Sequence, residues 1–358
     1  SDNHVNVGAN VLALIQGIAK NGDTLTVTLS SKELFGDATK PDTVVTVTKA
    51  MKNDKSEIAA ITFSNTNDRS TQIARPSDAN NYMDFSSLNT FADSLMKTAD
   101  LKQYHITGTA NVNMNIIGIK LNADVPTQFR LKLRDDNTVD SAYIELKVPY
   151  YPLVIQQDMV TKIYYRDNVL YFDRCWETSK IVWEKKKVGW WWVDVPVTKY
   201  YDHHEYMKCT MDEFMQNPMK YVYFSMNFSS MVEKAIDDAI AKSPQKAVRT
   251  GNIMFEEALT GFTYQAQNRW TVGLDAAHLV NNSDFADQMV VTLGRGNNGV
   301  LNTIDLSVQV LGFINLEFKN GQLQNANKTP VDMSMVPNNL NTNSNYQFGT
   351  TTSQDIQK

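Results

Sequence analysis

Short segments in which apolar and polar residues alternate recur along the chain, and they predict a largely antiparallel sheet. In residues 106–114, apolar or small side chains alternate with Thr and Asn, as in a strand with one buried and one wet face. Residues 129–133 and 142–148 repeat the alternation. Residues 160–165 and 169–176 predict a hairpin that turns at Arg166-Asp167-Asn168.

Helical spacing of apolar residues interrupts this strand pattern at three places. A short helix is predicted at residues 11–18, a second at about residues 86–101, where Phe91 and Leu95 share one face, and a third at residues 225–242, which contain Met231. Together the two patterns predict an α+β fold in which a few amphipathic helices accompany a large sheet.

A possible internal repeat links the start of the chain to a later segment. Residues 251–308 echo residues 8–64 in the order helix, strand, short helical turn, strand, strand, at a nearly constant offset. In the second copy, the apolar face of the predicted helix consists of Phe255, Leu259 and Phe262. We therefore expect a duplicated αβββ unit.

This repeat divides the chain into three predicted parts. An N-terminal αβββ unit occupies residues 1–80 and is repeated at residues 251–310, and a main curved-sheet domain covers residues 81–322. Residues 323–358 are rich in Asn, Gln, Thr and Ser, which predicts a loose polar tail.

Composition and charge narrow the classes of partner. With 358 residues, 42% of them hydrophobic, the chain has enough apolar surface for a substantial core. The formal charge of −5 shows no excess of Lys and Arg, so we expect no nucleic-acid partner. An apolar run of about 18 residues, the length that spans a bilayer, does not occur, and the sequence predicts no transmembrane helix.

The chain has only two cysteines, and both lie in strand-like sequence. Cys175 and Cys209 are too few for a disulfide scaffold and lack the paired spacing of a zinc site. A disulfide between them and two free thiols are equally compatible with the sequence.

Two adjacent histidines lie beside two carboxylates in residues 200–206 and suggest a metal site, but their spacing argues against it. In a strand, the side chains of His203 and His204 point to opposite faces and do not bind one ion. The sequence contains no nucleophile elbow, zinc-protease motif, phosphate-binding loop or dinucleotide fingerprint. We therefore expect no metal, cofactor or catalytic residue, and a protein that is not an enzyme.

The most unusual local feature is a basic segment flanked by tryptophans on a predicted hairpin. Two interpretations are open. The lysines and indoles could contact a membrane surface or the mouth of a cavity, or the indoles could pack on the sheet while the lysines form a solvated turn. Packing is the commoner fate of aromatic side chains and is the favoured interpretation. The residues are Trp183, Lys185, Lys186, Lys187, Trp190, Trp191 and Trp192.

Four sequence runs carry a resemblance to a known family. They follow the helix predicted near residue 86 and comprise residues 104–110, 129–133, 161–171 and 211–223. In their order and pattern, over about residues 85–320, the chain resembles bacterial envelope lipoproteins of the LolA/LppX-type fold. The segment at residues 8–64 departs from that pattern, because it precedes the helix where such proteins usually begin.

The resemblance implies a fold and a compartment. The fold would be a strongly curved antiparallel sheet, or half-barrel, that cups helices over an apolar cavity. The protein would be extracytoplasmic, either secreted or anchored by a lipidated cysteine upstream of Ser1.

Two functional hypotheses follow. In the first, a non-enzymatic lipoprotein binds or carries a lipid-like hydrophobic ligand beneath the two later helices, with Phe91, Leu95, Met231 and the tryptophan-lysine segment as contacts to ligand or membrane. In the second, the chain is a surface module for protein interaction or structure, with a filled core and no ligand.

Overall fold

A computed structural model describes most of the chain beyond residue 84 and three strands before it. The described residues are 24–29, 43–52, 55–65, 85–242, 259–266, 268–275, 288–310 and 312–358. The helix predicted at residues 11–18 and the short helical turns of the proposed repeat lie outside these ranges.

The strands and helices fall in the following order. The strands are β1 Thr24–Leu29, β2 Thr43–Lys52, β3 Lys55–Asn65, β4 Gln103–Ile116, β5 Ile119–Leu133, β6 Val139–Val148, β7 Met159–Arg166, β8 Val169–Val188, β9 Trp191–Thr210, β10 Leu259–Ala266, β11 Arg269–Asp275, β12 Gln288–Arg295, β13 Leu301–Val310, β14 Ile314–Leu323 and β15 Thr352–Gln357. The helices are α3 Phe85–Ala99, α4 Met211–Gln216, α5 Pro218–Met226 and α6 Ser230–Lys242, with a 3-10 turn at Leu340–Thr342.

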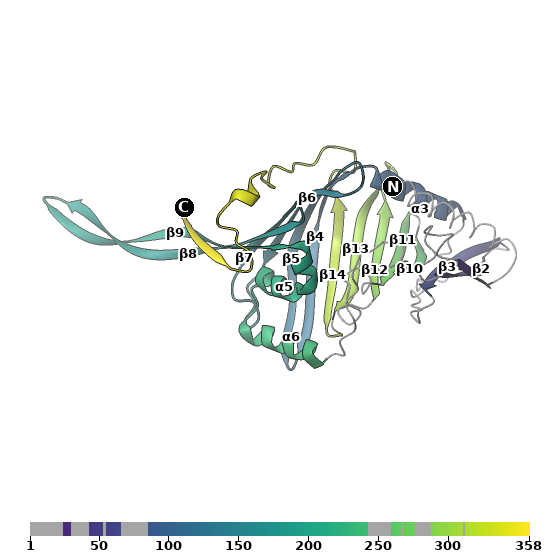
Figure 1. The fold of residues 1–358 in the computed structure, drawn as a ribbon, viewed down its shortest axis with the longest axis horizontal. Helices are drawn as coiled ribbons and strands as arrows, with labels where there is room; N and C mark the ends of the chain where they lie inside the picture. The colour runs from purple at the N-terminus through teal and green to yellow at the C-terminus, as the bar shows by residue number, and fades with distance from the viewer. Residues whose placement is uncertain are drawn as a thin grey trace.

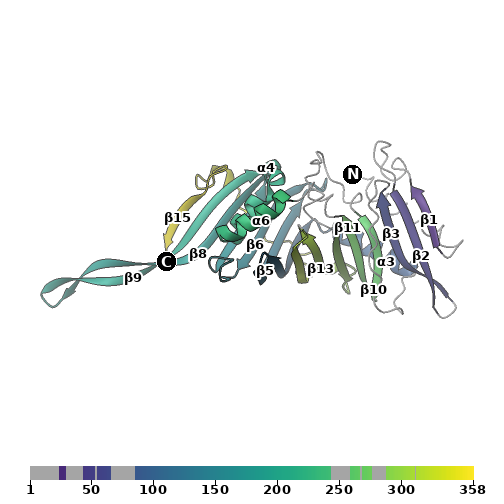
Figure 2. The same ribbon diagram turned by 90° about the horizontal axis from the view of Figure 1, so that it is seen from below.

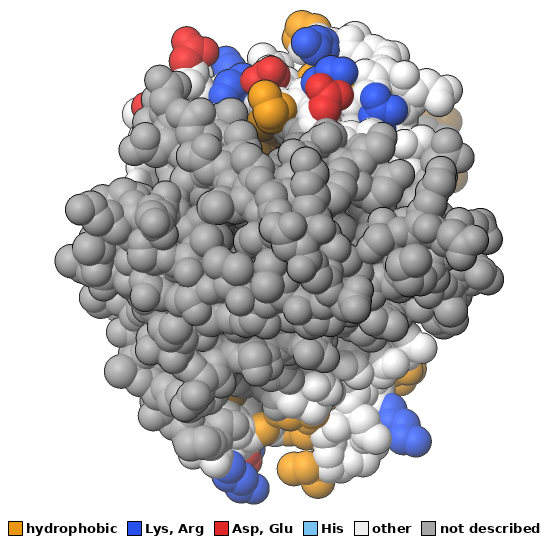
Figure 3. All heavy atoms as spheres, turned by 90° about the vertical axis from the view of Figure 1, so that its right-hand side faces the viewer, with side chains coloured by type: hydrophobic (Ala, Val, Ile, Leu, Met, Phe, Trp, Pro, Cys, Tyr) orange, Lys and Arg blue, Asp and Glu red, His pale blue; other side chains and the backbone are white. Residues whose placement is uncertain are grey.

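Within the described residues, one antiparallel sheet contains all fifteen strands. Its order is β1-β2-β3-β10-β11-β12-β13-β14-β4-β5-β6-β7-β8-β9-β15, so the N-terminal strands join those of the second repeat through β3 and β10. The sheet is open and curved, with β1 at one end and the β8–β9 hairpin projecting beyond the other (Figures 1 and 2). In the view from the β1 end, the coloured side chains above and below the grey region include both signs of charge and apolar groups (Figure 3).

The predicted antiparallel sheet with few helices is confirmed. β4, β5 and β6 pair as successive neighbours, and the β7–β8 hairpin turns at Asp167 and Asn168, both with positive φ. The helix predicted near residue 86 is α3.

The helix predicted at residues 225–242 is correct only from Ser230. Ser225 and Met226 belong to α5, which ends at Asn227 with a left-handed backbone (φ 48). Asn tolerates that conformation, which stops a helix at this point. The chain re-enters a helix only at Ser230, where α6 begins.

The second copy of the repeat does not begin with the predicted helix. Leu259 and Phe262 lie in strand β10, where Phe262 pairs with Val272 of β11 and Ile61 of β3. Phe255 lies outside the described residues. The apolar spacing of this segment also fits a helix. It forms a strand because its backbone pairs with β3 on one side and β11 on the other.

Helices α5 and α6 cover one face of the sheet around β4 and β5. Val232 and Ile236 of α6 pack with Met114 and Leu121 of the sheet in one buried cluster, which Met226 of α5 also joins. The space between these helices and the strands is therefore occupied by side chains.

The prediction of a loose tail after residue 322 is wrong. Val336, Leu340 and Tyr346 are buried against tyrosines of the sheet, and β15 pairs along β9 from Thr352 to Gln357. A few widely spaced apolar residues anchor this segment, because they fill gaps that the sheet leaves open.

Candidate functional site

The outer half of the β8–β9 hairpin projects beyond the rest of the described structure (Figure 1). The two strands of the hairpin, of 20 residues each, pair in register from Val169 opposite Thr210 to Val188 opposite Trp191. Gly189, with φ 63, and Trp190 form the two-residue turn, a conformation that glycine adopts without strain.

The outer half of this hairpin, residues 180–199, is here called the arm. Pairing of β7 with β8 stops at Cys175, and pairing of β15 with β9 stops at Tyr201. Beyond these points the arm strands pair, among the described residues, only with each other. Nine residues on each side give the arm a length of about 30 Å, and Figure 1 shows it extending away from the body.

The four tryptophans of the arm are exposed to solvent. The exposed fractions are 68% for Trp183, 92% for Trp190, 79% for Trp191 and 66% for Trp192. The favoured interpretation, in which these side chains pack on the sheet, is therefore wrong. The reason is that the arm extends past its sheet neighbours, so none of the described strands or helices covers either face.

The tip of the arm is formed by residues 188–192, and its tryptophans point in several directions. Trp192 lies opposite Lys187, whereas Trp191 lies opposite Val188 and therefore on the other face of the ribbon. Trp190 occupies the turn itself. The tip thus presents aromatic surface on both faces and at its end.

The arm is basic although the whole chain is acidic. Residues 180–199 contain five lysines and two carboxylates, against a formal charge of −5 for the chain. Lys199 forms an ion pair of 2.7 Å with Glu184 across the arm, and this contact lowers the pKa of Glu184. Lys185, Lys186 and Lys187 occupy consecutive positions beside the tip.

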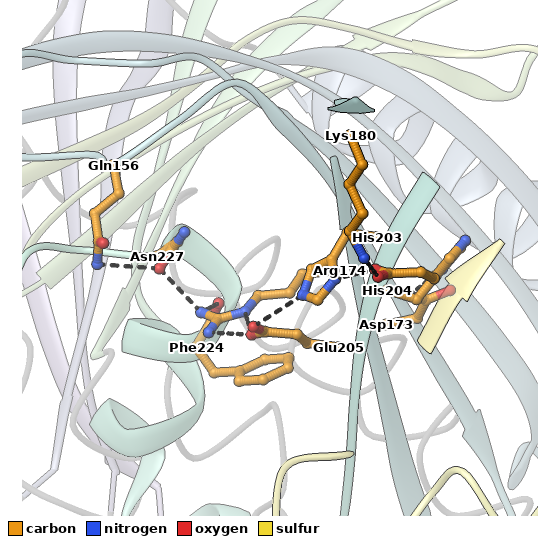
Figure 4. A network of polar contacts seen from close by, with 10 residues as sticks. Gln156, Asp173, Arg174, Lys180, His203, His204, Glu205, Phe224 and Asn227 are labelled. Carbon is orange, nitrogen blue, oxygen red and sulfur yellow. Dashed lines mark hydrogen bonds and ion pairs between the residues drawn. The ribbon is translucent and has the colours of Figure 1, made fainter. Parts of the chain in front are cut away.

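The inner half of the hairpin, residues 169–179 of β8 and 200–210 of β9, is here called the base. A polar network on the face that the helices cover holds this base in place (Figure 4). Arg174 binds the Glu205 carboxylate at 2.5 Å and donates to the Phe224 carbonyl at 3.0 Å, at the end of α5. It also donates to Asn227 at 3.2 Å, and its guanidinium lies 4.2 Å from the centre of the Phe224 ring. Arg174 therefore links both hairpin strands to the helix that follows them.

His203 ties the C-terminal strand to the same base. Its Nδ1 lies 2.6 Å from Asp355 of β15, and Lys180 binds the other oxygen of that carboxylate at 2.6 Å. The contacts with Lys180 and then His203 lower the pKa of Asp355. The start of the arm is thus braced on the β15 side.

The opposite face of the base carries a second polar cluster. His204 Nδ1 lies 2.9 Å from Asp173, and its Nε2 lies 3.5 Å from the Cys175 sulfur. Hydrogen bonds to Asp173 and then to Cys175 raise the pKa of His204 to about 10. The expected placement of His203 and His204 on opposite faces is confirmed. No three His, Cys, Asp or Glu side chains converge as metal ligands in the described part of the chain.

A disulfide between Cys175 and Cys209 does not occur, and both thiols are free. Cys209 lies opposite Leu170, five positions along β8 from Cys175, or about 17 Å away. The two side chains also face opposite sides of the sheet, far outside the reach of a disulfide.

The structure does not assemble the predicted ligand contacts into one site. Phe91 of α3 packs on the buried Trp270, with ring centres 5.2 Å apart. Leu95 of α3 and Met231 of α6 are exposed, and these helices lie away from the tip of the arm (Figure 1). Only the tryptophan-lysine segment remains as a continuous exposed surface.

Sequence reasoning missed both polar clusters at the hairpin base, although one signal was available. A turn centred on Gly189 and Trp190 fixes the register of the whole hairpin and places His204 opposite Cys175. Extending that register from the turn would have paired these residues. No such rule connects Arg174 with Phe224, which belongs to a helix.

Comparison with known proteins gives no relative from which to infer a function. No protein-family model matches the chain, and no curated protein matches its sequence. None of the described helices is long and apolar enough to cross a membrane.

Proposed function

We propose that this protein binds the surface of an anionic lipid bilayer outside the cytoplasm through the tip of its β8–β9 arm, without catalysing a reaction. The observation that carries the proposal is the group of solvent-exposed tryptophans on a free, basic hairpin. Contiguous exposed apolar surface of this kind is typical of an interaction site.

The chemistry of the tip suits a bilayer interface. Indole rings have an apolar body and one N–H donor, and they are enriched at the level of lipid headgroups. Lysines near an anionic surface contribute about 1 kcal/mol each. The consecutive lysines 185–187 lie three to five residues before Trp190, so indoles and ammonium groups can engage the same surface together.

The directions of the indoles favour lipid over a protein surface. Trp190 extends from the turn, while Trp191 and Trp192 lie on opposite faces of the ribbon. A flat partner would cover one of these faces and leave the other exposed. A fluid interface that surrounds the inserted tip covers both faces at once.

Lipid carriage in an interior cavity is less well supported than contact at the tip. Buried side chains occupy the space between α5, α6 and the strands below them. The resemblance to LolA/LppX-type lipoproteins supports the extracytoplasmic location in the proposal. Under this proposal, the hydrophobic ligand of the protein is the bilayer itself.

The second candidate, a protein-interaction module, is favoured by the filled core. It predicts that the tip contacts another protein and has no affinity for lipid. Vesicle binding therefore separates the two candidates.

The test is co-sedimentation of the full chain with vesicles. We expect binding to vesicles of mixed phosphatidylglycerol and phosphatidylcholine, and much weaker binding to phosphatidylcholine alone. Replacement of Trp190, Trp191 and Trp192 by Ser should reduce binding at least 100-fold. Met231→Ser, which removes an exposed apolar side chain on α6, serves as the matched control and should bind as the unaltered chain does.

The lysines provide a second, independent variant. Changing Lys185, Lys186 and Lys187 to Gln removes about 3 kcal/mol of electrostatic attraction, or about 100-fold in affinity for anionic vesicles. Added salt should weaken binding of the unaltered chain in the same direction. Absence of binding to either vesicle, or equal binding by the tryptophan variant, would overturn the proposal.

We also propose that β1–β3 and β11–β13 derive from a duplicated unit. Both are three-strand antiparallel meanders, and Leu25 pairs with Val47 as Trp270 pairs with Leu293, at corresponding positions of the two copies. A meander of this kind is common in antiparallel sheets, so the matching register, rather than the topology, supports duplication.

A further inference from the structure

A cysteine, a histidine and a carboxylate align on one face of the hairpin base. Asp173 and Cys175 are alternate residues of β8, and His204 of β9 lies directly opposite Cys175. His204 directs Nε2 toward the sulfur at 3.5 Å and Nδ1 toward Asp173 at 2.9 Å; Figure 4 shows the imidazole beside the carboxylate. This is the order of nucleophile, base and orienting group that activates thiols.

We infer that Cys175 is a reactive thiol that exchanges with small disulfides, with His204 as its acid–base partner and Asp173 as a positioning residue. Cys175 is partly exposed, so a small molecule has access to this side of β8. The inference goes beyond lipid binding and does not depend on it, because the cluster lies at the base of the hairpin and not at its tip.

The surroundings hold the imidazole in the orientation that the reaction needs. Asp173 is buried and accepts the Nδ1 hydrogen bond, which leaves Nε2 directed at the sulfur. Tyr206 stacks on the ring with centres 5.5 Å apart and planes nearly parallel. The hydrogen bonds to Asp173 and Cys175 raise the pKa of His204 to about 10, so the ring is positively charged near neutral pH. A cation beside sulfur favours the thiolate, which is the attacking species.

Other charged groups of this face are paired or more distant from the sulfur. Lys162 of β7 lies opposite Asp173, and Val160 of the same strand lies opposite Cys175. Toward the arm, Glu177 and Asp202 both bind Lys358. His204 is therefore the charged group that the sulfur contacts directly.

Cys209 gives an internal contrast. It is fully buried on the helix-covered face among Phe172, Tyr221 and Phe224. Burial raises the pKa of Cys209 to about 11. We expect this thiol to be inert in the folded chain.

The exchange step is balanced without any further reagent. The Cys175 thiolate attacks one sulfur of a small disulfide, a bond forms between the two sulfurs, and the original disulfide bond breaks. The departing thiolate takes a proton from the His204 imidazolium. The product is a mixed disulfide at Cys175, which a small thiol reverses by the same route.

The test is intact-mass spectrometry of the full chain incubated with oxidised glutathione near pH 7. We expect one glutathionyl group on the unaltered protein and on Cys209→Ser, the matched control, and none on Cys175→Ser. His204→Gln should react at least tenfold more slowly. Its rate should rise about tenfold per pH unit between about pH 6 and 8, whereas the rate of the unaltered chain should change much less.

Asp173→Asn should also slow the reaction, because the imidazole loses its fixed orientation, and its pH profile should move toward that of His204→Gln. Labelling in denaturant, where both thiols are accessible, shows that each variant retains its cysteines. The inference is overturned if the folded, unaltered chain forms no adduct, or if its rate rises tenfold per pH unit like an ordinary thiol. Equal rates for His204→Gln and the unaltered chain overturn it as well.

Discussion

The buried side chain of Ile236 offers a direct measure of whether α6 covers a packed core or a ligand cavity. Ile236 is fully buried in the cluster that joins α6 to the sheet. Ile236→Ala removes three carbon atoms, which is worth about 2.4 kcal/mol at about 0.8 kcal/mol per buried group. The space left behind adds roughly 1 kcal/mol because a packed core relaxes only in part. We therefore expect the free energy of unfolding to fall by about 3–4 kcal/mol.

The assay is urea unfolding followed by both circular dichroism and tryptophan fluorescence. A lower midpoint with an unchanged slope indicates a loss of stability, and coincident transitions support a two-state analysis. Met231→Ala on the same helix is the control; its side chain is 47% exposed, so its effect should stay within about 0.5 kcal/mol. The measurement is repeated on protein extracted with organic solvent to remove any bound lipid.

A loss below about 1 kcal/mol for Ile236→Ala would refute the packed-core argument. So would a loss that appears only in protein that retains lipid, because the stabilising contacts would then come from a ligand. Either result would restore the hypothesis of an interior lipid site beneath α5 and α6.

Three further predictions concern the hairpin base and the C-terminal segment. Tyr346→Ala should lower the free energy of unfolding in urea by about 3 kcal/mol, because the ring is buried edge-on against Tyr171 and Tyr206, with ring centres 5.2 Å apart in each pair. A loss below about 1 kcal/mol would support the earlier prediction of a loose tail. The raised pKa of His204 means that its stabilising contribution is complete below its ordinary value of 6.5 and is lost as pH rises through about 10; urea midpoints should fall over that range, and less so in Asp173→Asn. Arg174→Met should cost about 2 kcal/mol, since it leaves the Glu205 carboxylate without its cation, and an unchanged midpoint would show that this ion pair adds nothing.

The sequence predicted the central strands well because they have one wet face. In the second half of β4, Val112 and Met114 pack in the buried cluster while Asn113 and Asn115 are exposed, so the alternation reports which side is buried. In β10, Leu259 and Phe262 are also spaced as on a helix, and only their pairing with β3 and β11 makes the segment a strand. The pairing with β3 joins residues about 200 positions apart in sequence, which local periodicity does not report.

The errors at the candidate site have a related cause. The tryptophans were expected to pack on the sheet because aromatic side chains are usually buried. Whether they are buried depends, however, on whether another element covers them. Pairing with β7 stops at Cys175 and pairing with β15 stops at Tyr201, so no described strand covers the arm beyond these points. The tail shows the reverse case: its polar composition predicted a loose segment, yet Val336 and Leu340 are enough to anchor it.

The hairpin has a base that other elements hold in place and an arm that projects freely. This division explains how one element can be stable and also expose a binding surface. An isolated two-stranded ribbon is at best marginally stable in water, so the arm depends on the order of its base. Arg174 fixes one face to α5, while His203 and Lys180 fix the edge to β15 through Asp355. Because these contacts lie at or before the start of the arm, the exposed indoles of the tip contribute little to stability. Substitutions at the tip should therefore change binding and leave the unfolding midpoint nearly unchanged, whereas Arg174→Met should lower the midpoint first and affect binding only through the orientation of the arm.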